Sequence, residues 1–290
     1  MSGFTLIELC VVIVAVAMVG MTVLPALARA RPNTRVSQCL DNARQLAATV
    51  QMYTVDNHDM YPPNPGDGTV LAGYNWCGGS TEEAFDPDIL TNNATCLVAP
   101  YLNRNSTVFS CPADPRYGLY DGSQFNLFGT RLHAVRSVSM NGSVGTIDPG
   151  ALTGGAHGGV PNTPAPGWWL TGVHGGNSHD NPWATFGKTA DFRVVKPSQI
   201  FLITDEDPYS INDAYLSVSA GTAEFVDYPA TFHDHGCTMS FCDGHVELHR
   251  WTGSLIILNS PFPKTQTVPP GGSDYADWTW LWQHSTVRMK

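Results

Sequence analysis

Residues 1–28 read MSGFTLIELCVVIVAVAMVGMTVLPALA, and this stretch decides the fold that we expect. Glu8 is its only charged side chain, and residues 9–28 carry no charge. A helix of that length crosses the hydrocarbon layer of a bilayer, which is about 30 Å thick. A carboxylate in such a run costs about 2.5–3.5 kcal/mol at the centre of a span and less near its end. The sequence therefore predicts a membrane-spanning helix in which Glu8 has a partner.

A cleaved secretory signal peptide is the alternative for this stretch. Ala26-Leu27-Ala28 resembles a small-x-small cleavage site. However, residues 1–3 carry no basic side chain, the apolar run is longer than that of a signal peptide, and Glu8 does not fit one. We therefore expect a retained membrane helix.

A family resemblance starts at the beginning of this helix. The run Gly3-Phe4-Thr5-Leu6-Ile7-Glu8-Leu9 resembles the processing and methylation motif of type IV prepilins and type II secretion pseudopilins. The resemblance implies that a prepilin peptidase cuts after Gly3 and that the new N-terminal residue, Phe4, is N-methylated. It also implies that Glu8 pairs with the N-terminal amine of a neighbouring subunit during assembly. That role would supply the partner that the carboxylate requires.

Composition limits the class of protein. The chain has 290 residues and a net charge of −10, so we expect no nucleic-acid partner, because a polyanion needs a basic surface. The 28 glycines, 21 prolines and 8 tryptophans indicate many turns, short strands and long loops. Roughly 230 residues follow the N-terminal helix, which is enough for one domain with its own core.

The cysteines indicate an oxidising compartment. Cys10 lies in the apolar run and is expected to act as a small buried hydrophobe. The other six are even in number, although six cysteines allow 15 pairings; they are Cys39, Cys77, Cys96, Cys111, Cys237 and Cys242. There is no Cys-x-x-Cys, so we expect no zinc ribbon.

The charge rule for membrane topology predicts the opposite location for the domain that follows the span. Arginines follow the span, at Arg29, Arg31, Arg35 and Arg44, and alone they would keep the C-terminal side in the cytoplasm. Long domains are translocated largely regardless of charge. The prepilin resemblance and the cysteines therefore outweigh the charge rule, and they imply a single-pass protein in the bacterial inner membrane with its head in the periplasm.

A second helical segment follows the span. Apolar side chains recur there at steps of three and four residues, which predicts an amphipathic helix with one buried stripe; they are Val36, Leu40, Ala43, Ala47, Val50 and Tyr53. If this helix continues from the span to Asn57, it reaches roughly 80 Å. Pro32 lacks an amide hydrogen and disfavours the helical conformation at Arg31, so we expect a kink or short break there.

Two strands and two aromatic segments are expected in the head. Residues 137–141 and the apolar run 200–203 are predicted as strands, the second ending at Asp205-Glu206-Asp207. Residues 142–187 form a long Gly/Pro-rich segment, whose tryptophans we expect to anchor it to the head, although a sugar-stacking platform is the alternative. The aromatic residues 274–282 are expected to pack on the head or on a neighbouring subunit.

The strongest strand signal is a hairpin over residues 238–249. Asp243-Gly244 between alternating segments predicts a two-residue type I′ turn, which places Phe241 opposite Val246 and extends the pairing outward from there. We expect the apolar face of this hairpin to cover the amphipathic helix. Cys237 and Cys242 would be about 16 Å apart along one strand, too far for a disulfide, which needs Cα atoms within about 7 Å.

Two further motifs resemble prepilin-like heads. The run Phe109-Ser110-Cys111-Pro112-Ala113-Asp114, together with Cys39 at the start of the amphipathic helix, resembles features of large Gram-negative prepilin-like proteins, which implies a Cys39–Cys111 disulfide. His233 with Asp243-Gly244 resembles the His-x9-Asp-Gly signature of a group of such proteins abundant in planctomycetes and related bacteria. That signature implies no catalytic role.

Metal binding is the open question in this region. A metal site could be formed by His233, Asp234, His235, Asp243, His245 and His249, but we expect a polar sheet face with a turn-forming aspartate, because spacing alone rarely fixes ligands. We expect no cofactor, although Asp205, Glu206 and Asp207 are candidate ligands for a structural calcium ion. The sequence has no nucleophile elbow, phosphate-binding loop or His-Glu-x-x-His, so we expect no enzyme.

The expected fold is α+β: a long N-terminal helix, transmembrane and then amphipathic, packed on an antiparallel β-sheet head with long loops. Residues 1–3 would be the prepilin leader, 4–57 the membrane and assembly helix, and 58–290 the globular head. The expected function is a structural subunit of a type IV pilus-like filament or a type II secretion pseudopilus. Its partners would be other pilin subunits, the prepilin peptidase and the inner membrane. The alternatives are a membrane-anchored exported metalloenzyme and a surface glycan-binding adhesin.

Overall fold

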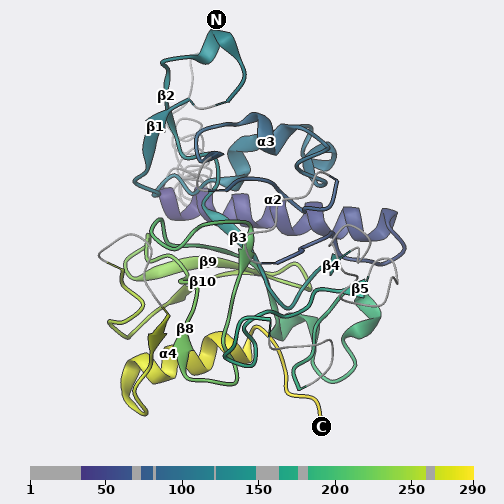
Figure 1. Cartoon of the computed structure of the whole chain (residues 1–290), viewed down its shortest axis with the longest axis vertical. Coiled ribbons are helices and arrows are strands. Elements are labelled where there is room, and N and C mark those ends of the chain that lie inside the picture. Colours follow the sequence, from purple (N-terminus) through teal and green to yellow (C-terminus); the bar gives the residue numbers. More distant parts are fainter. Residues whose placement is uncertain are drawn as a thin grey trace, which may run out of the picture.

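The computed structural model describes residues 34–66, 73–80, 83–120, 122–147, 163–175, 182–258 and 265–290. These residues form an α+β fold with few helices and a mixed sheet of five strands (Figure 1). Residues 1–33, which hold the expected leader and membrane span, lie outside this part of the chain. Within the described ranges, no helix has both the length and the apolar character needed to cross a membrane.

Helix α2 (Arg35–Asp56) is the predicted amphipathic helix, and it ends one residue before the predicted boundary. Its N-cap, Thr34, has an extended backbone (φ −89°, ψ 145°), and the Thr34 hydroxyl accepts a hydrogen bond from the Ser37 amide at 3.2 Å. A capping hydroxyl satisfies one of the amides that a helix start leaves without a partner. Helix α2 therefore starts at Arg35, three residues after the proline where a kink or break was expected.

The buried face of α2 is centred slightly differently from the predicted stripe. Ala43, Ala47 and Val50 are buried as predicted, whereas Val36, Leu40 and Tyr53 are only half-buried. The complete buried set is Cys39, Ala43, Leu46, Ala47, Thr49, Val50 and Thr54. Helix α2 thus presents small residues to the sheet over most of its length, which allows it to lie close to the strands.

The central sheet has the strand order β10-β9-β6-β3-β7. Its strands are β3 (Val138–Asn141), β6 (Phe201–Asp205), β7 (Tyr215–Leu216), β9 (Gly236–Phe241) and β10 (Val246–Arg250). Strands β3 and β6 confirm the two strands predicted from the sequence, and every residue in both is buried. Strand β6 lies at the centre of the sheet, which explains its continuous apolar run.

The expectation of a purely antiparallel sheet was wrong at one edge. Strand β7 pairs with β3 in parallel, through Met140 opposite Tyr215. The other neighbours in the sheet are antiparallel. After β6 the chain crosses to the far side of β3 and reverses, so that β7 runs in the same direction as β3. A two-residue strand has no periodicity from which this pairing could be predicted.

The remaining elements are short. They are α3 (Asp88–Thr91), the strand pairs β1 (Tyr117–Leu119) with β2 (Arg131–His133), β4 (Thr146–Ile147) with β5 (Thr163–Pro164) and β8 (Glu224–Phe225) with β11 (Gln266–Thr267), and the 3₁₀ helices η2 (Ala99–Leu102), η3 (Ser106–Phe109), η4 (Phe125–Leu127), η5 (Thr189–Asp191) and η6 (Pro197–Gln199). The chain between α2 and β3 is therefore mostly loops and single turns, as its composition indicates.

The hairpin formed by β9 and β10 exists, but its predicted register was wrong by one residue. Val246 lies opposite Ser240 rather than Phe241. The Phe241 amide donates to the His245 carbonyl at 2.9 Å, and the Gly244 amide donates to the Phe241 carbonyl at 2.9 Å. The loop therefore has three residues, and Gly244 has a positive φ of 92°. An Asp-Gly pair suits this loop as well, because the glycine takes the left-handed position that follows a type I turn.

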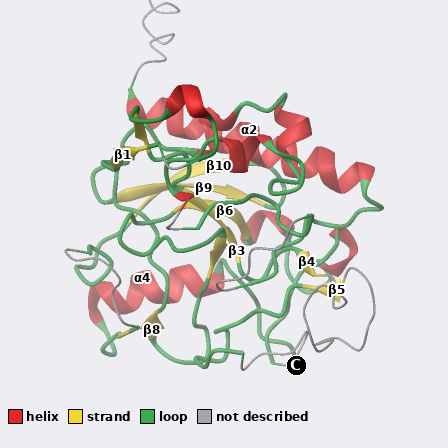
Figure 2. Ribbon diagram, turned by 45° about the horizontal axis from the view of Figure 1, so that its top comes forward, coloured by secondary structure: helices red, strands yellow, loops and turns green. Residues whose placement is uncertain are grey.

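The predicted apolar face of the hairpin is divided, contrary to expectation: in the observed register, Val246 and Leu248 lie on the opposite face of the sheet from Met239 and Phe241. Met239 and Phe241 pack with Trp278 and Leu281 of helix α4 (Gly272–Gln283), on the side of the sheet away from α2. Figure 2 shows α2 on one side of the strands and α4 on the other. One covering helix was expected, whereas the sheet has apolar layers on both faces.

The aromatic C-terminal segment packs on the head, which was one of its two predicted positions. The Trp278 indole nitrogen donates to the Ser219 carbonyl at 2.8 Å. Trp183, from the long Gly/Pro-rich segment, is 7% exposed and contacts Trp282 edge-on at 5.6 Å between ring centroids. This tryptophan therefore anchors its segment to the head, as predicted. Much of that segment, residues 148–162 and 176–181, lies outside the described residues.

Candidate functional site

The assembly residues predicted from the sequence, Gly3, Phe4 and Glu8, lie outside the described residues. Two features of the described structure bear on function. One is the outer face of α2, and the other is a buried group of sulfur, nitrogen and oxygen atoms between α2 and the sheet.

The outer face of α2 carries apolar side chains in contact with solvent. Met52 is 46% exposed and Val55 is 75% exposed. With Ala48 they recur at steps of four and three residues, so they share one side of the helix. Tyr101 from η2 lies beside them, and its hydroxyl donates to an Asp56 carboxylate oxygen at 3.1 Å. We call Ala48, Met52, Val55 and Tyr101 the outer apolar strip.

Under the first turns of α2, a disulfide joins the helix to the head. Cys39 of α2 is bonded to Cys111, which follows η3, with 5.4 Å between the Cα atoms. The pairing implied by the prepilin resemblance is therefore confirmed. The Cys111 amide donates to the Ser137 hydroxyl at 2.6 Å, which fixes the loop beside β3. Cys237 and Cys242 are free and buried, in agreement with the separation expected along one strand.

His233 lies against this disulfide. Its Nε2 is 3.3 Å from Cys111 Sγ, and the side chain is 5% exposed. Burial lowers the pKa of His233, because a charged imidazolium loses hydration there. The following residues, Asp234 and His235, have positive φ angles of 55° and 59°. This tight turn brings His233 under α2 immediately before β9 begins.

The last member of the buried group is Asp205, which lies at the end of β6. Its carboxylate accepts hydrogen bonds from the Thr238 amide at 2.9 Å and from the Thr238 hydroxyl at 2.6 Å. Burial raises the pKa of Asp205 to about 6, although the bonds from Thr238 act against the rise. One ligand atom from each of Cys39, Cys111, Asp205 and His233 lies within 4.8 Å of the others. We call these four residues the Cys-His-Asp cluster.

The other histidines and aspartates of the hairpin do not join this cluster. His245 and Asp243 pair with each other at 2.6 Å on the surface. Asp234 forms an exposed ion pair with Arg250. His249 stacks on Trp280 with 3.5 Å between ring centroids. The metal site that could have combined these groups with His233 is thus not assembled, and the metalloenzyme hypothesis loses the arrangement on which it depended.

The three consecutive acidic residues that begin with the last residue of β6 have different hydrogen-bond partners. Glu206 accepts hydrogen bonds from the hydroxyls of Ser139 and Ser210, and Asp207 accepts one from the Tyr209 amide at 2.9 Å. Within the described ranges, the carboxylates of Asp205, Glu206 and Asp207 do not converge as a group that could hold one ion. The calcium hypothesis therefore gains no support from these residues.

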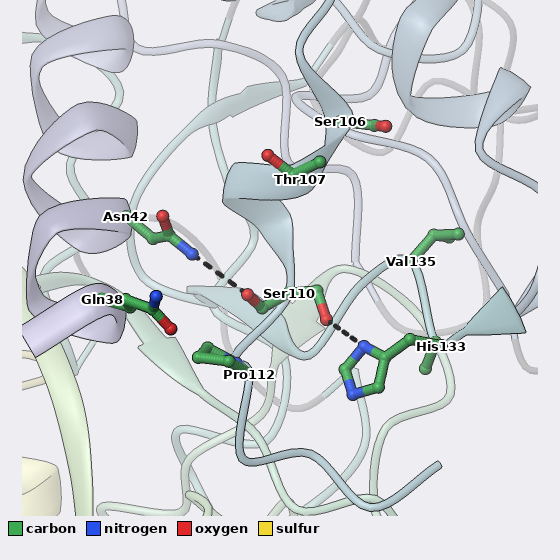
Figure 3. Close-up of a pocket in the computed structure, with 9 residues that line it drawn as sticks. Gln38, Asn42, Ser106, Thr107, Ser110, Pro112, His133 and Val135 are labelled. Carbon is green, nitrogen blue, oxygen red and sulfur yellow. Dashed lines mark hydrogen bonds between the residues drawn. The ribbon is translucent and has the colours of Figure 1, made fainter. Parts of the chain in front are cut away.

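A hollow of about 460 Å³ lies between α2 and η3 (Figure 3). Asn42 of α2 donates to the Ser110 carbonyl at 3.1 Å. The Ser110 hydroxyl is 3.0 Å from His133 Nδ1, and His133 Nε2 is 2.7 Å from the Asp114 carbonyl. A carbonyl only accepts, so Nε2 carries a proton, and in the neutral ring Nδ1 then accepts from the Ser110 hydroxyl. These bonds hold the loop that carries Cys111 against α2.

Comparison with models of known protein families, with curated proteins and with solved structures gives no match. The site is therefore described by its own geometry.

Sequence reasoning missed the meeting of Asp205 and His233 with the cysteines. Asp205 and His233 are 28 positions apart in the chain. They meet because β6 and β9 pair in the sheet. The only sequence signal was indirect: His233 belongs to the His-x9-Asp-Gly signature, and Cys111 belongs to a second motif of the same kind of head.

Proposed function

We propose that this chain is a structural subunit of a type IV pilus-like filament or a type II secretion pseudopilus. In this proposal, Gly3 is the processing site, Phe4 becomes the methylated N-terminus, and Glu8 pairs with the N-terminal amine of a neighbouring subunit. The protein is stored in the inner membrane through residues 9–28 and is then extracted into the filament. Its role is assembly rather than catalysis.

The observation that carries the proposal is the order of the segments along the chain. A prepilin-type motif and an uncharged run of 20 residues are followed, after residues 29–34, by α2, a helix of 22 residues attached along one side to the head. A subunit that assembles through its N-terminal helix needs this connection, because force on the helix has to reach the head. The Cys39–Cys111 disulfide covalently joins the start of α2 to the loop after η3.

The outer apolar strip adds support. A solvent-exposed valine and methionine on one side of α2 leave apolar area that a neighbouring subunit could cover. In a filament built from packed helices, this side of α2 is the one that remains free of the sheet.

Replacement of Glu8 tests the proposal. An unpaired carboxylate in hydrocarbon is unfavourable, so Glu8→Ala should leave membrane insertion intact or improved and reduce incorporation into sheared surface filaments. Thr5→Ala, a change in the same segment that keeps the carboxylate, is the matched control. Normal incorporation of Glu8→Ala would show that no charge pair between subunits is needed.

A second variant tests the outer apolar strip. Val55→Lys lies on an exposed position, so it should change the stability of the head by no more than about 0.5 kcal/mol. It should nevertheless lower the amount of subunit in filaments, because a lysine at this position would place an uncompensated charge between packed helices.

A further inference from the structure

We propose that the Cys-His-Asp cluster is a redox-gated metal site, which binds one zinc ion when the Cys39–Cys111 disulfide is reduced and none when it is formed. This inference does not depend on the proposed function in filament assembly. It concerns what holds α2 to the head when the disulfide is absent.

The donor set suits zinc. Two thiolate sulfurs, one imidazole nitrogen and one carboxylate oxygen are all groups that bind Zn²⁺, and four protein ligands make a closed structural site. In the described structure the four donors come from four places: α2, the loop after η3, the end of β6 and the turn before β9. A metal ion bound there would therefore join α2 to the loop after η3, to β6 and to the turn before β9.

The distances are close to those of a tetrahedral site. With zinc–sulfur bonds of about 2.3 Å and zinc–nitrogen or zinc–oxygen bonds of about 2.0–2.1 Å, the ligand atoms of a tetrahedron lie about 3.3–3.8 Å apart. Here the four ligand atoms all lie within 4.8 Å of one another, and Cys111 Sγ to His233 Nε2 is already 3.3 Å. The longest edge would contract by about 1–1.5 Å at most, and the two sulfurs, freed by reduction, would move apart to about 3.8 Å.

The surroundings are prepared for an ion. All four residues are buried, with exposed fractions between 1% for Cys111 and 5% for His233. The Thr238 amide and hydroxyl fix the Asp205 carboxylate, which is the kind of supporting contact that orients metal ligands. Such a site excludes water, so the protein alone would supply the ligands.

The disulfide and the metal exclude each other because they use the same two sulfur atoms. A dithiol reductant transfers two electrons to the Cys39–Cys111 bond, which yields two thiols, and the reductant becomes a cyclic disulfide. Binding of Zn²⁺ then displaces one proton from each thiol. Oxidation reverses the sequence: the two thiolates give up two electrons to an oxidant, form the disulfide and release the ion.

The experiment uses the full chain, purified in detergent, in oxidised and reduced forms. After the reductant is removed without air, each form is titrated with Co²⁺ and then with Zn²⁺ against a chromophoric chelator. We expect one equivalent of metal and a thiolate-to-cobalt charge-transfer band in the reduced form only. The other five cysteines of the chain, Cys10 among them, are present in both forms, so their contribution cancels in the comparison.

Variants separate the cluster from other ligands. His233→Ala should weaken metal binding by about tenfold or more, and Asp205→Asn should change the cobalt spectrum. Cys237→Ala removes a buried free cysteine outside the cluster and should leave binding unchanged. Circular dichroism checks that each variant is folded. The proposal is overturned if the reduced protein binds metal no more tightly than the oxidised protein, or if a folded Asp205→Asn or His233→Ala variant binds as wild type does.

Discussion

Reduction of the Cys39–Cys111 disulfide should destabilise the head substantially. The bond joins the second turn of α2 to the loop after η3, and the two cysteines are 72 positions apart in the chain. The link therefore restricts a long segment of the unfolded chain. In the folded state both cysteines are held by other contacts, since Cys39 lies in a helix and the Cys111 amide donates to Ser137.

The size of the effect follows from loop closure. For a loop of 72 residues, the chain-entropy relation gives about 4.4 kcal/mol at 25 °C. Measured effects commonly fall below this value, so we expect a loss of about 2–4 kcal/mol on reduction. Reduction leaves both sulfur atoms in place and creates no large cavity, so little is added by lost packing. Against a typical domain stability of 5–15 kcal/mol, such a loss is a large fraction of the total.

Urea unfolding of residues 34–290, oxidised and reduced, measures this effect. A chelator is present throughout, so that no metal replaces the disulfide. The double variant Cys39→Ala/Cys111→Ala is the control and should not respond to reductant. A wild-type change below about 1 kcal/mol, or an equal response in the double variant, would refute the reasoning.

Two other predictions follow from the packing of β9 and β10. Phe241→Ala should cost about 3–5 kcal/mol in thermal or urea unfolding, because Phe241 is 2% exposed in the core beside α4; Phe125→Ala, at an 87% exposed position, should cost no more than about 0.5 kcal/mol. Burial, together with the nearby His284, lowers the pKa of His249 to about 4 from 6.5. The folded state then binds fewer protons than the unfolded state, so stability should be full above pH 6.5 and fall toward pH 4. Partial solvent exposure limits this loss to about 1–2 kcal/mol. Wild type loses stability as the pH falls from 6.5 to 4, and His249→Phe should not show this loss. The free energy of unfolding of wild type, measured relative to that of His249→Phe, should therefore fall over this range. A relative value that stays constant with pH would contradict the pKa shift.

The elements with strong local signals were predictable from the sequence. Helix α2 has apolar residues at helical spacing and polar residues elsewhere, and the structure places its end within one residue of the prediction. Strand β6 has a continuous apolar run because it is the central strand. In both cases, local pattern and tertiary packing favour the same conformation.

The register of the hairpin could not be predicted from its turn residues alone. Asp243-Gly244 fits a two-residue turn with two left-handed residues and also a three-residue loop in which only Gly244 is left-handed. The structure has the second form. Because side chains alternate along a strand, a shift of one residue changes every cross-strand partner.

Helix α4 was missed as a helix because its start lacks the usual signals. Its N-cap is Gly271, which makes no side-chain hydrogen bond. Its tryptophans lie on several sides of the helix, so the segment has no clear apolar stripe. Packing against the sheet, with Trp278 and Leu281 buried, determines this element. That packing also explains why the apolar side chains of β9 turn away from α2.

The mass of the mature N-terminus tests the central claim most directly. Mass spectrometry of the protein purified from membranes should identify a chain that begins at Phe4 and carries an N-methyl group. A chain that begins at Met1 would show that no prepilin peptidase processes this protein. A chain that begins at Arg29 would show that residues 1–28 are removed as a signal peptide, and either result would contradict the proposed role in a filament.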